Sequence, residues 1–340
     1  MKHILIPFPV TREQSKTLQQ AGQGAELRFR LGEALPSGRG GLLPFDDMLQ
    51  SPLMEPSDLE WADAVLGNID PALIQAAPQL QWVQTSSAGV EAYTKPGVLS
   101  EGAVLTNATG AYGLAISEHM LGMLLEIFKK LELYRDAQRE EDWRSQGNVR
   151  SVYGSTVLVL GMGDIGGDFA RLCKAMGAYV IGVRRTDTRV PDFAHEVHLT
   201  GELDELLPRA NVVAVTLPGT PATQGLISRE RIARMKPGAV VLNVGRGSVL
   251  DTEALCDALE SGQLGGAGLD VTDPEPLPRG HRLWQIPTAV VTPHVSGGYH
   301  LLETHERIVG IFAENLRHFL AGEPMRNVID FATGYRKARG

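Results

Sequence analysis

The sequence contains only two cysteines, Cys173 and Cys256, and no uninterrupted apolar run of the roughly 18 residues that a membrane-spanning helix needs. A disulfide scaffold and a zinc cluster built from cysteines are therefore excluded. Basic residues are also few, because 32 Lys and Arg stand against 40 Asp and Glu in 340 residues. The resulting formal charge of −8 argues against nucleic acid or a membrane surface as the main partner. The first residues lack the apolar stretch of a signal peptide, so we expect a cytoplasmic protein.

The chain does have a regular alternation of short apolar segments and helical patterns, together with 38 glycines. Apolar strands separated by helices are typical of a parallel sheet that is covered on both faces. Strands are predicted over residues 3–8, 64–66, 81–84, 104–106, 157–160, 179–183, 196–199, 212–217, 239–243, 267–271 and 289–292. We expect one long helix over 114–140 and another over 301–320. Residues 31–56, rich in Gly, Pro and Ser, are expected to be irregular.

A glycine-rich motif directly follows the strand predicted over 157–160, and it reads Gly161-Met162-Gly163-Asp164-Ile165-Gly166. Its glycines permit a tight turn and let backbone N–H groups approach a pyrophosphate, while the N-terminus of the next helix faces the same anion. An ordinary glycine turn is the alternative interpretation. The strand before the motif and the helical pattern after it favour a dinucleotide site.

The end of the next predicted strand indicates which dinucleotide is bound. A site for NAD carries an Asp or Glu there, about 20 residues beyond the glycines, to hold the ribose 2′-hydroxyl. This chain instead carries Arg184 and Arg185. Guanidinium groups bind a 2′-phosphate through paired hydrogen bonds, so we expect NADP to be preferred and NAD to be possible. A pair of solvated loop arginines is the alternative.

Three further segments, 243–247, 268–278 and 292–297, each follow a predicted strand. The carboxyl ends of parallel strands meet at the ligand crevice of an open α/β sheet, so Arg246, Glu275 and His294 are predicted to lie close together. This trio suffices to reduce a 2-keto acid. The arginine binds the substrate carboxylate and polarises the ketone, the histidine gives the proton, and the glutamate holds the histidine. His195 and His198 lie on a predicted strand with opposite orientations, so we expect no metal site there.

With these motifs the chain resembles the D-isomer-specific 2-hydroxyacid dehydrogenases over nearly its whole length. Further motifs that carry the resemblance lie in segments 85–90, 106–110, 116–119 and 217–223. The resemblance implies two Rossmann-like domains with doubly wound parallel sheets. The dinucleotide-binding domain, residues 111–295, would be inserted into a discontinuous substrate domain made of residues 1–110 and 296–340.

The resemblance also implies roles for individual residues. Arg246, Glu275 and His294 match the catalytic trio. The backbone amides of three loop residues would bind the substrate carboxylate, and these are Ser87, Ala88 and Gly89. Besides the glycine motif and the two arginines, the residues expected to contact the cofactor are Leu217, Pro218, Thr223, Val244, Gly245, Asp270, Ser296 and Gly297. The family forms dimers through its cofactor domains, so a homodimer is expected, with the helix over 114–140 contributing.

The expected activity is NAD(P)H-dependent reduction of a small 2-keto acid to the D-2-hydroxy acid. The arginine pair is similar to that of glyoxylate/hydroxypyruvate reductases, which makes glyoxylate and hydroxypyruvate the first substrates to consider. Two alternatives stay open. One is a dehydrogenase for larger apolar 2-keto acids, and the other is a protein that senses NAD(H) and recruits partners, as a corepressor of this family does.

Overall fold

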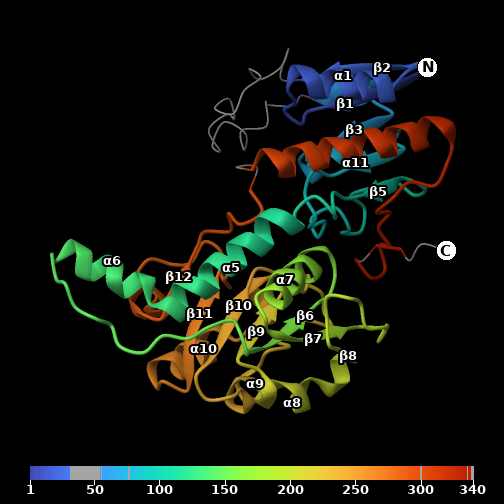
Figure 1. Cartoon of the computed structure of the whole chain (residues 1–340). Coiled ribbons are helices and arrows are strands. Elements are labelled where there is room, and N and C mark those ends of the chain that lie inside the picture. The colour runs from blue at the N-terminus through green and yellow to red at the C-terminus, as the bar shows by residue number, and fades with distance from the viewer. Residues whose placement is uncertain (31–53, 55, 76, 299–300, 335, 338–340) are drawn as a thin grey trace. The chain divides into compact units, whose positions relative to one another are not determined.

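A computed structural model describes residues 1–30, 54, 56–75, 77–298, 301–334 and 336–337 of the chain (Figure 1). The chain divides into two compact units. Unit 1 comprises Met1–Tyr112 and Gly298–Gly340, and unit 2 comprises Gly113–Gly297. The segment 31–56, expected to be irregular, lies almost entirely outside the described residues.

Unit 1 contains a five-stranded sheet with the strand order β2-β1-β3-β4-β5. Every neighbouring pair of strands is parallel. The strands are β1 (Lys2–Ile6), β2 (Ala25–Phe29), β3 (Ala64–Leu66), β4 (Trp82–Gln84) and β5 (Val104–Thr106). The helices are α1 (Arg12–Ala21), α3 (Pro56–Trp61), α4 (Pro71–Gln75) and α11 (Leu302–Ala321). The C-terminal helix therefore belongs to the same unit as the N-terminal strands.

The edge strand β2 was not predicted from the sequence. Its residues alternate between partly buried and exposed positions, because one face of the strand meets solvent. Glu26 and Arg28 interrupt the strand, so it lacks the continuous apolar run by which the other strands were recognised, and it carries no β-branched residue. The alternation of Ala25, Leu27 and Phe29 with polar residues is the signal that could have found it.

His305 of α11 is buried in unit 1, where its ring stacks on Phe8 with a centroid distance of 4.6 Å. Burial lowers the pKa of His305 to about 4, although a hydrogen bond with the Pro9 backbone opposes this shift. The unfolded chain then binds the proton more readily than the folded chain, so stability rises with pH across this range. The contribution is complete above pH 6.5 and is lost as the pH falls towards 4.

We expect unit 1 to lose about 3 kcal/mol of unfolding free energy between pH 7 and pH 4 through His305, at about 1.4 kcal/mol per pKa unit. Denaturant titrations over this range measure the loss, and the variant His305→Phe should show a smaller one. His318→Gln, at a partly exposed site on the same helix, is the control. An equal pH dependence in wild type and His305→Phe would contradict the assignment.

Unit 2 contains a seven-stranded sheet with the order β12-β11-β10-β9-β6-β7-β8. All neighbouring pairs are again parallel. The strands are β6 (Thr156–Leu160), β7 (Tyr179–Arg184), β8 (Glu196–Leu199), β9 (Val212–Val215), β10 (Ala239–Asn243), β11 (Leu264–Leu269) and β12 (Ala289–Val291). The order reverses at the junction of β6 and β9, where ligands bind in open α/β sheets. The prediction of an α/β fold with two doubly wound parallel sheets is confirmed.

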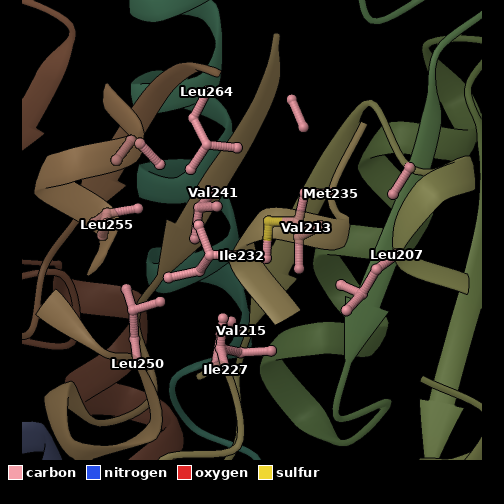
Figure 2. Packing of buried hydrophobic residues seen from close by; sticks show 14 of the residues in the cluster. Leu207, Val213, Val215, Ile227, Ile232, Met235, Val241, Leu250, Leu255 and Leu264 are labelled. Atoms are coloured by element: carbon pink, nitrogen blue, oxygen red, sulfur yellow. The ribbon is translucent and has the colours of Figure 1, made fainter. Parts of the chain in front are cut away.

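The helices of unit 2 are α5 (Gly113–Lys129), α6 (Leu131–Arg139), α7 (Asp164–Ala175), α8 (Leu203–Leu206), α9 (Arg229–Arg234) and α10 (Thr252–Glu260). One face of the sheet packs against α8, α9 and α10, as Figure 2 shows for side chains such as Val213, Val241 and Ile232. Cys256 of α10 belongs to this core and is fully buried. Among the described residues, no helix has the length and apolar character needed to cross a membrane.

The prediction of a single helix over 114–140 is wrong in one respect, because two helices, α5 and α6, occupy this range. Lys130 separates α5 from α6 and has a φ of 58°, which a right-handed helix cannot continue. Its Nζ donates a hydrogen bond to the carbonyl of Gln146 at 2.6 Å. The buried apolar face of α5 ends at this break, and the next residue, Leu131, is 52% exposed.

Strand β11 begins at Leu264, three residues earlier than predicted. Gly265 and Gly266 carry no apolar side chain to mark a strand. At Gly266 an added Cβ would lie 2.5 Å from the side chain of Ile127 in α5. Glycine is present here because the helix packs directly on the strand backbone.

Candidate active site

The glycine-rich turn joins β6 to α7 in unit 2. A Cβ added to Gly166 would lie 1.9 Å from the carbonyl oxygen of Gly161, so only glycine fits where the first turn of α7 packs on the end of β6. Gly163 is the N-cap of α7 and is exposed, and a Cβ added there would meet no atom within 4 Å. The N-terminus of α7 is therefore open at Gly163, and this geometry fits the pyrophosphate of a dinucleotide.

The remaining residues of the motif differ in what they can offer a cofactor. Met162 is 6% exposed, and its side chain packs against Gly182 in β7. Only its backbone is available to a ligand. Asp164 and Ile165 lie in the first turn of α7 and are partly exposed.

Two arginines contact one carboxylate just beyond the end of β7. Arg184 Nη1 lies 3.6 Å from Asp187 Oδ2, and Arg189 Nη2 donates to the same oxygen at 2.9 Å. The hydrogen bonds from Arg189 lower the pKa of Asp187 to about 2. Arg185 is exposed beside this cluster. The sequence prediction did not anticipate Asp187, but the cluster as a whole is net positive, as an anionic 2′-phosphate requires.

The loops that follow β9 and β10 contact each other. A Cβ added to Gly245 would lie 2.3 Å from the carbonyl oxygen of Leu217. Thr223 is buried and its hydroxyl donates to the carbonyl of Pro218 at 2.6 Å. Among the residues expected to bind the cofactor, Thr223 therefore uses its side chain to hold its own loop.

The backbone around Arg246 is fixed by Asn243, the buried last residue of β10. Asn243 Nδ2 donates to the Arg246 carbonyl at 3.0 Å, and Asn243 Oδ1 accepts from the Gly245 amide at 3.1 Å. Arg246 Nη1 donates to the carbonyl of Gly245 at 2.7 Å. These bonds hold the guanidinium of Arg246 against the loop that follows β10.

The segments of Arg246, Glu275 and His294 form one continuous set of contacts. Gly247 lies directly on Thr272, whose carbonyl oxygen would be 1.9 Å from a Cβ added to Gly247. The Thr272 amide donates to Glu275 Oε1 at 3.0 Å, and Glu275 Oε2 lies 2.9 Å from His294 Nδ1. The carboxylate holds Nδ1, so the other ring nitrogen, Nε2, is the one left for a substrate. Both side chains are accessible, with 49% of His294 and 38% of Glu275 exposed.

The loop that carries His294 wraps around a buried carboxylate. Asp270 is 1% exposed, and its two oxygens accept four hydrogen bonds from the hydroxyl of Thr292, the amide of Val295, and the amide and hydroxyl of Ser296. His294 has a φ of 54° and donates its own amide to the Asp270 carbonyl at 2.8 Å. The side chain of Asp270 therefore holds the histidine loop, and its expected contact with the nicotinamide stays a prediction.

The predicted substrate loop of unit 1 follows β4. Ser87 Oγ donates to the Gly89 carbonyl at 2.7 Å, and Asn107 Nδ2 donates to the Ala88 carbonyl at 2.7 Å. Asn68 Oδ1 accepts from the Ser86 amide at 3.0 Å. In the described parts of the chain no acceptor is recorded for the amides of Ala88 and Gly89, which leaves them for an anionic group.

His195 and His198, which raised the question of a metal site, each bind protein groups. His195 stacks on Tyr179 and its Nδ1 accepts from the Val180 amide. His198 lies between Glu196 and Glu202 at 2.8 and 2.7 Å, and these carboxylates raise its pKa. Within the described ranges no group of three or more His, Cys, Asp or Glu side chains could hold a metal ion.

The NAD binding domain of one protein family matches residues 121–296, which is more than half of the chain and covers the glycine turn, Arg246, Glu275 and His294. The chain belongs to the D-isomer specific 2-hydroxyacid dehydrogenases. The resemblance inferred from the motifs is thereby confirmed, and with it the assignment to the dehydrogenase class of enzymes.

Three related proteins illustrate the range of this family. Glyoxylate/hydroxypyruvate reductase B of Pectobacterium carotovorum is 30% identical over 82% of this dehydrogenase and 89% of its own length. D-3-phosphoglycerate dehydrogenase of Mycobacterium bovis is 33% identical over 80% of the chain, and the chain spans about half the length of that relative. The solved structure of an NADPH-dependent glyoxylate/hydroxypyruvate reductase from Sinorhizobium meliloti, in complex with NADP and sulfate, is 26% identical. It superposes with a TM-score of 0.79 over 98% of the chain and 100% of its own.

The structure of the dehydrogenase also contains residues that the sequence analysis missed or did not use. Asn68 follows β3, so the rule that strand ends carry functional residues could have found it. His119 Nε2 lies 3.0 Å from Thr292 Oγ1, a contact between residues far apart in the sequence. Sequence alone offers no signal for that pairing.

Proposed function

We propose that this dehydrogenase reduces a small 2-keto acid of the glyoxylate or hydroxypyruvate type to the D-2-hydroxy acid, with NADPH preferred over NADH. The observation that carries the proposal is the hydrogen bond of His294 Nδ1 to Glu275, which leaves Nε2 accessible beside the segment of Arg246. The reductases of Pectobacterium and Sinorhizobium support the substrate class, and the Sinorhizobium complex supports the cofactor.

The cofactor would be held by the glycine turn and by the loops that follow β7, β9 and β10. The exposed N-terminus of α7 and the close packing of Gly166 on Gly161 fit a pyrophosphate. The cluster of Arg184, Arg185 and Arg189 fits a 2′-phosphate. When bound, the reduced nicotinamide supplies the hydride that converts the keto carbon to an alcohol.

The chain itself supplies the proton and the charge that the reduction needs. His294 in its doubly protonated form donates the proton on Nε2 to the keto oxygen, while Glu275 accepts from Nδ1 and fixes the ring orientation. The guanidinium of Arg246 stabilises the negative charge that develops on the keto oxygen. In unit 1 the amides of Ala88 and Gly89 would bind a substrate carboxylate.

Absorbance loss of NADPH and NADH against a panel of 2-keto acids tests the proposal. The panel contains glyoxylate, hydroxypyruvate, phosphohydroxypyruvate and phenylpyruvate, so that the phosphoglycerate and large apolar substrates are included. Turnover of glyoxylate or hydroxypyruvate with the highest kcat/KM supports the proposal. Preference for phenylpyruvate or phosphohydroxypyruvate would refute the substrate class. Tight cofactor binding without any turnover would favour a sensing protein.

Arg184 provides a sharper test of the cofactor preference. Hydrogen bonds to charged groups contribute about 1.5–3 kcal/mol, so Arg184→Ala should raise the KM for NADPH by about tenfold or more. The KM for NADH should change less than about threefold, because NADH has no 2′-phosphate for the arginine to bind. Each cofactor serves as the control for the other in the same variant. Equal kcat/KM for both cofactors in the wild type would contradict the preference.

A further inference from the structure

A chain of two hydrogen bonds leads from helix α5 to the loop that carries His294. His119 lies on α5, and its Nε2 is 3.0 Å from Thr292 Oγ1. Thr292 follows β12, and its hydroxyl lies 2.6 Å from Asp270 Oδ1. His119, Thr292 and Asp270, which make these two hydrogen bonds, all belong to unit 2.

The number of protons available to these groups determines which atom donates in each hydrogen bond. A threonine hydroxyl carries one hydrogen and can donate only once, whereas an ionised carboxylate can only accept. The oxygens of Asp270 accept from four donors, so the hydroxyl of Thr292 gives its hydrogen to Asp270. Thr292 must then accept from His119, which places a proton on His119 Nε2.

We propose that His119 is a positioning residue for the reaction, because it donates to Thr292 and so orients the carboxylate that holds the loop of His294. The inference rests on the proposed role of His294 as the proton donor. His119 touches neither substrate nor cofactor in this scheme. It acts through Thr292 and Asp270.

The loop needs such support because its central residue is strained. His294 has a φ of 54°, a left-handed conformation that a non-glycine residue keeps only where the surrounding structure imposes it. The amides of Val295 and Ser296 and the hydroxyl of Thr292 all bind the Asp270 carboxylate. A carboxylate that rotates after losing Thr292 releases the loop, and Nε2 of His294 then leaves its productive position.

Two pairs of variants in the full-length protein test the proposal. His119→Phe and Thr292→Val remove the hydrogen bonds and should each lower kcat by about tenfold. His119→Gln, whose amide nitrogen can replace Nε2, and Thr292→Ser should recover most of that loss. The double variant His119→Phe with Thr292→Val should lose no more than one single variant, because both break the same chain.

A spectroscopic measurement tests the hydrogen bond from His119 to Thr292 independently of enzyme activity. In protein labelled with ¹⁵N-histidine, the Nε2 resonance of His119, assigned by its loss in His119→Gln, should be that of a protonated nitrogen at pH 8. An unprotonated Nε2 overturns the proposal, as does a kcat within twofold of wild type in His119→Phe and Thr292→Val. If the wild type reduces no 2-keto acid, the proposed function fails. The resonance still decides whether the hydrogen-bond chain exists.

Discussion

Replacing His294 with glutamine is expected to lower kcat for keto-acid reduction by about a thousandfold. General acid catalysis by a positioned side chain contributes about 10² to 10⁴ in rate, and glutamine fills similar space without a transferable proton. Nδ1 of His294 is held by Glu275 at 2.9 Å, so the loss should appear in kcat and not in cofactor affinity. Steady-state kinetics with saturating NADPH and a fluorescence titration of NADPH measure the two quantities separately.

Two companion variants sharpen this result. Glu275→Gln should lower kcat less than His294→Gln does, because the histidine stays in place and loses only the charge beside it. His318→Gln, at a partly exposed histidine of α11, should leave kcat within twofold of wild type. A His294→Gln protein with more than a tenth of the wild-type kcat would show that another group delivers the proton.

Gly247→Ala is expected to reduce kcat/KM by about a hundredfold without any change in a charged side chain. The added Cβ would lie 1.9 Å from the Thr272 carbonyl oxygen and 2.0 Å from the carbonyl carbon, so one backbone segment must move. Arg246 lies on one of these segments and Glu275 on the other. A misplacement of about 1 Å at a reacting centre can cost a hundredfold in rate. Kinetics with the preferred keto acid provides the measurement.

The matched control for this variant is Gly310→Ala. Gly310 lies on the exposed side of α11, and a Cβ there would meet nothing within 4 Å, so activity should be retained. Full activity in Gly247→Ala would mean that the contact of the Arg246 segment with Thr272 has no part in catalysis. Melting temperatures of both variants separate a local displacement from loss of the fold.

The sequence sufficed to predict the strands of the unit 2 sheet and the proximity of Glu275 and His294. The inner strands β6, β9 and β10 are buried along nearly their whole length and therefore appear as apolar runs, whereas β8 and β12 are only partly buried. Glu275 and His294 come together because each follows a parallel strand, and such strands end at one edge of the sheet. That rule requires no knowledge of side-chain contacts.

Features that depend on long-range or side-chain geometry could not be predicted. The left-handed Lys130 follows a helical pattern that continues in the sequence past the point where the helix ends. Asp187 is visible in the sequence, but its position between Arg184 and Arg189 depends on side-chain rotamers. The pairing of His119 with Thr292 joins residues 173 positions apart. Such contacts follow from packing and leave no local pattern.

The charged groups around β8 have a consequence for association between molecules. This strand is the last in its sheet, so its outer backbone N–H and C=O groups could template another strand. Hydrogen bonds from Arg209, His198 and Tyr179 lower the pKa of Glu196 to about 2, so its ion pair with Arg209 persists near neutral pH. An incoming strand would have to separate or bury this ion pair, which opposes aggregation through the β8 edge.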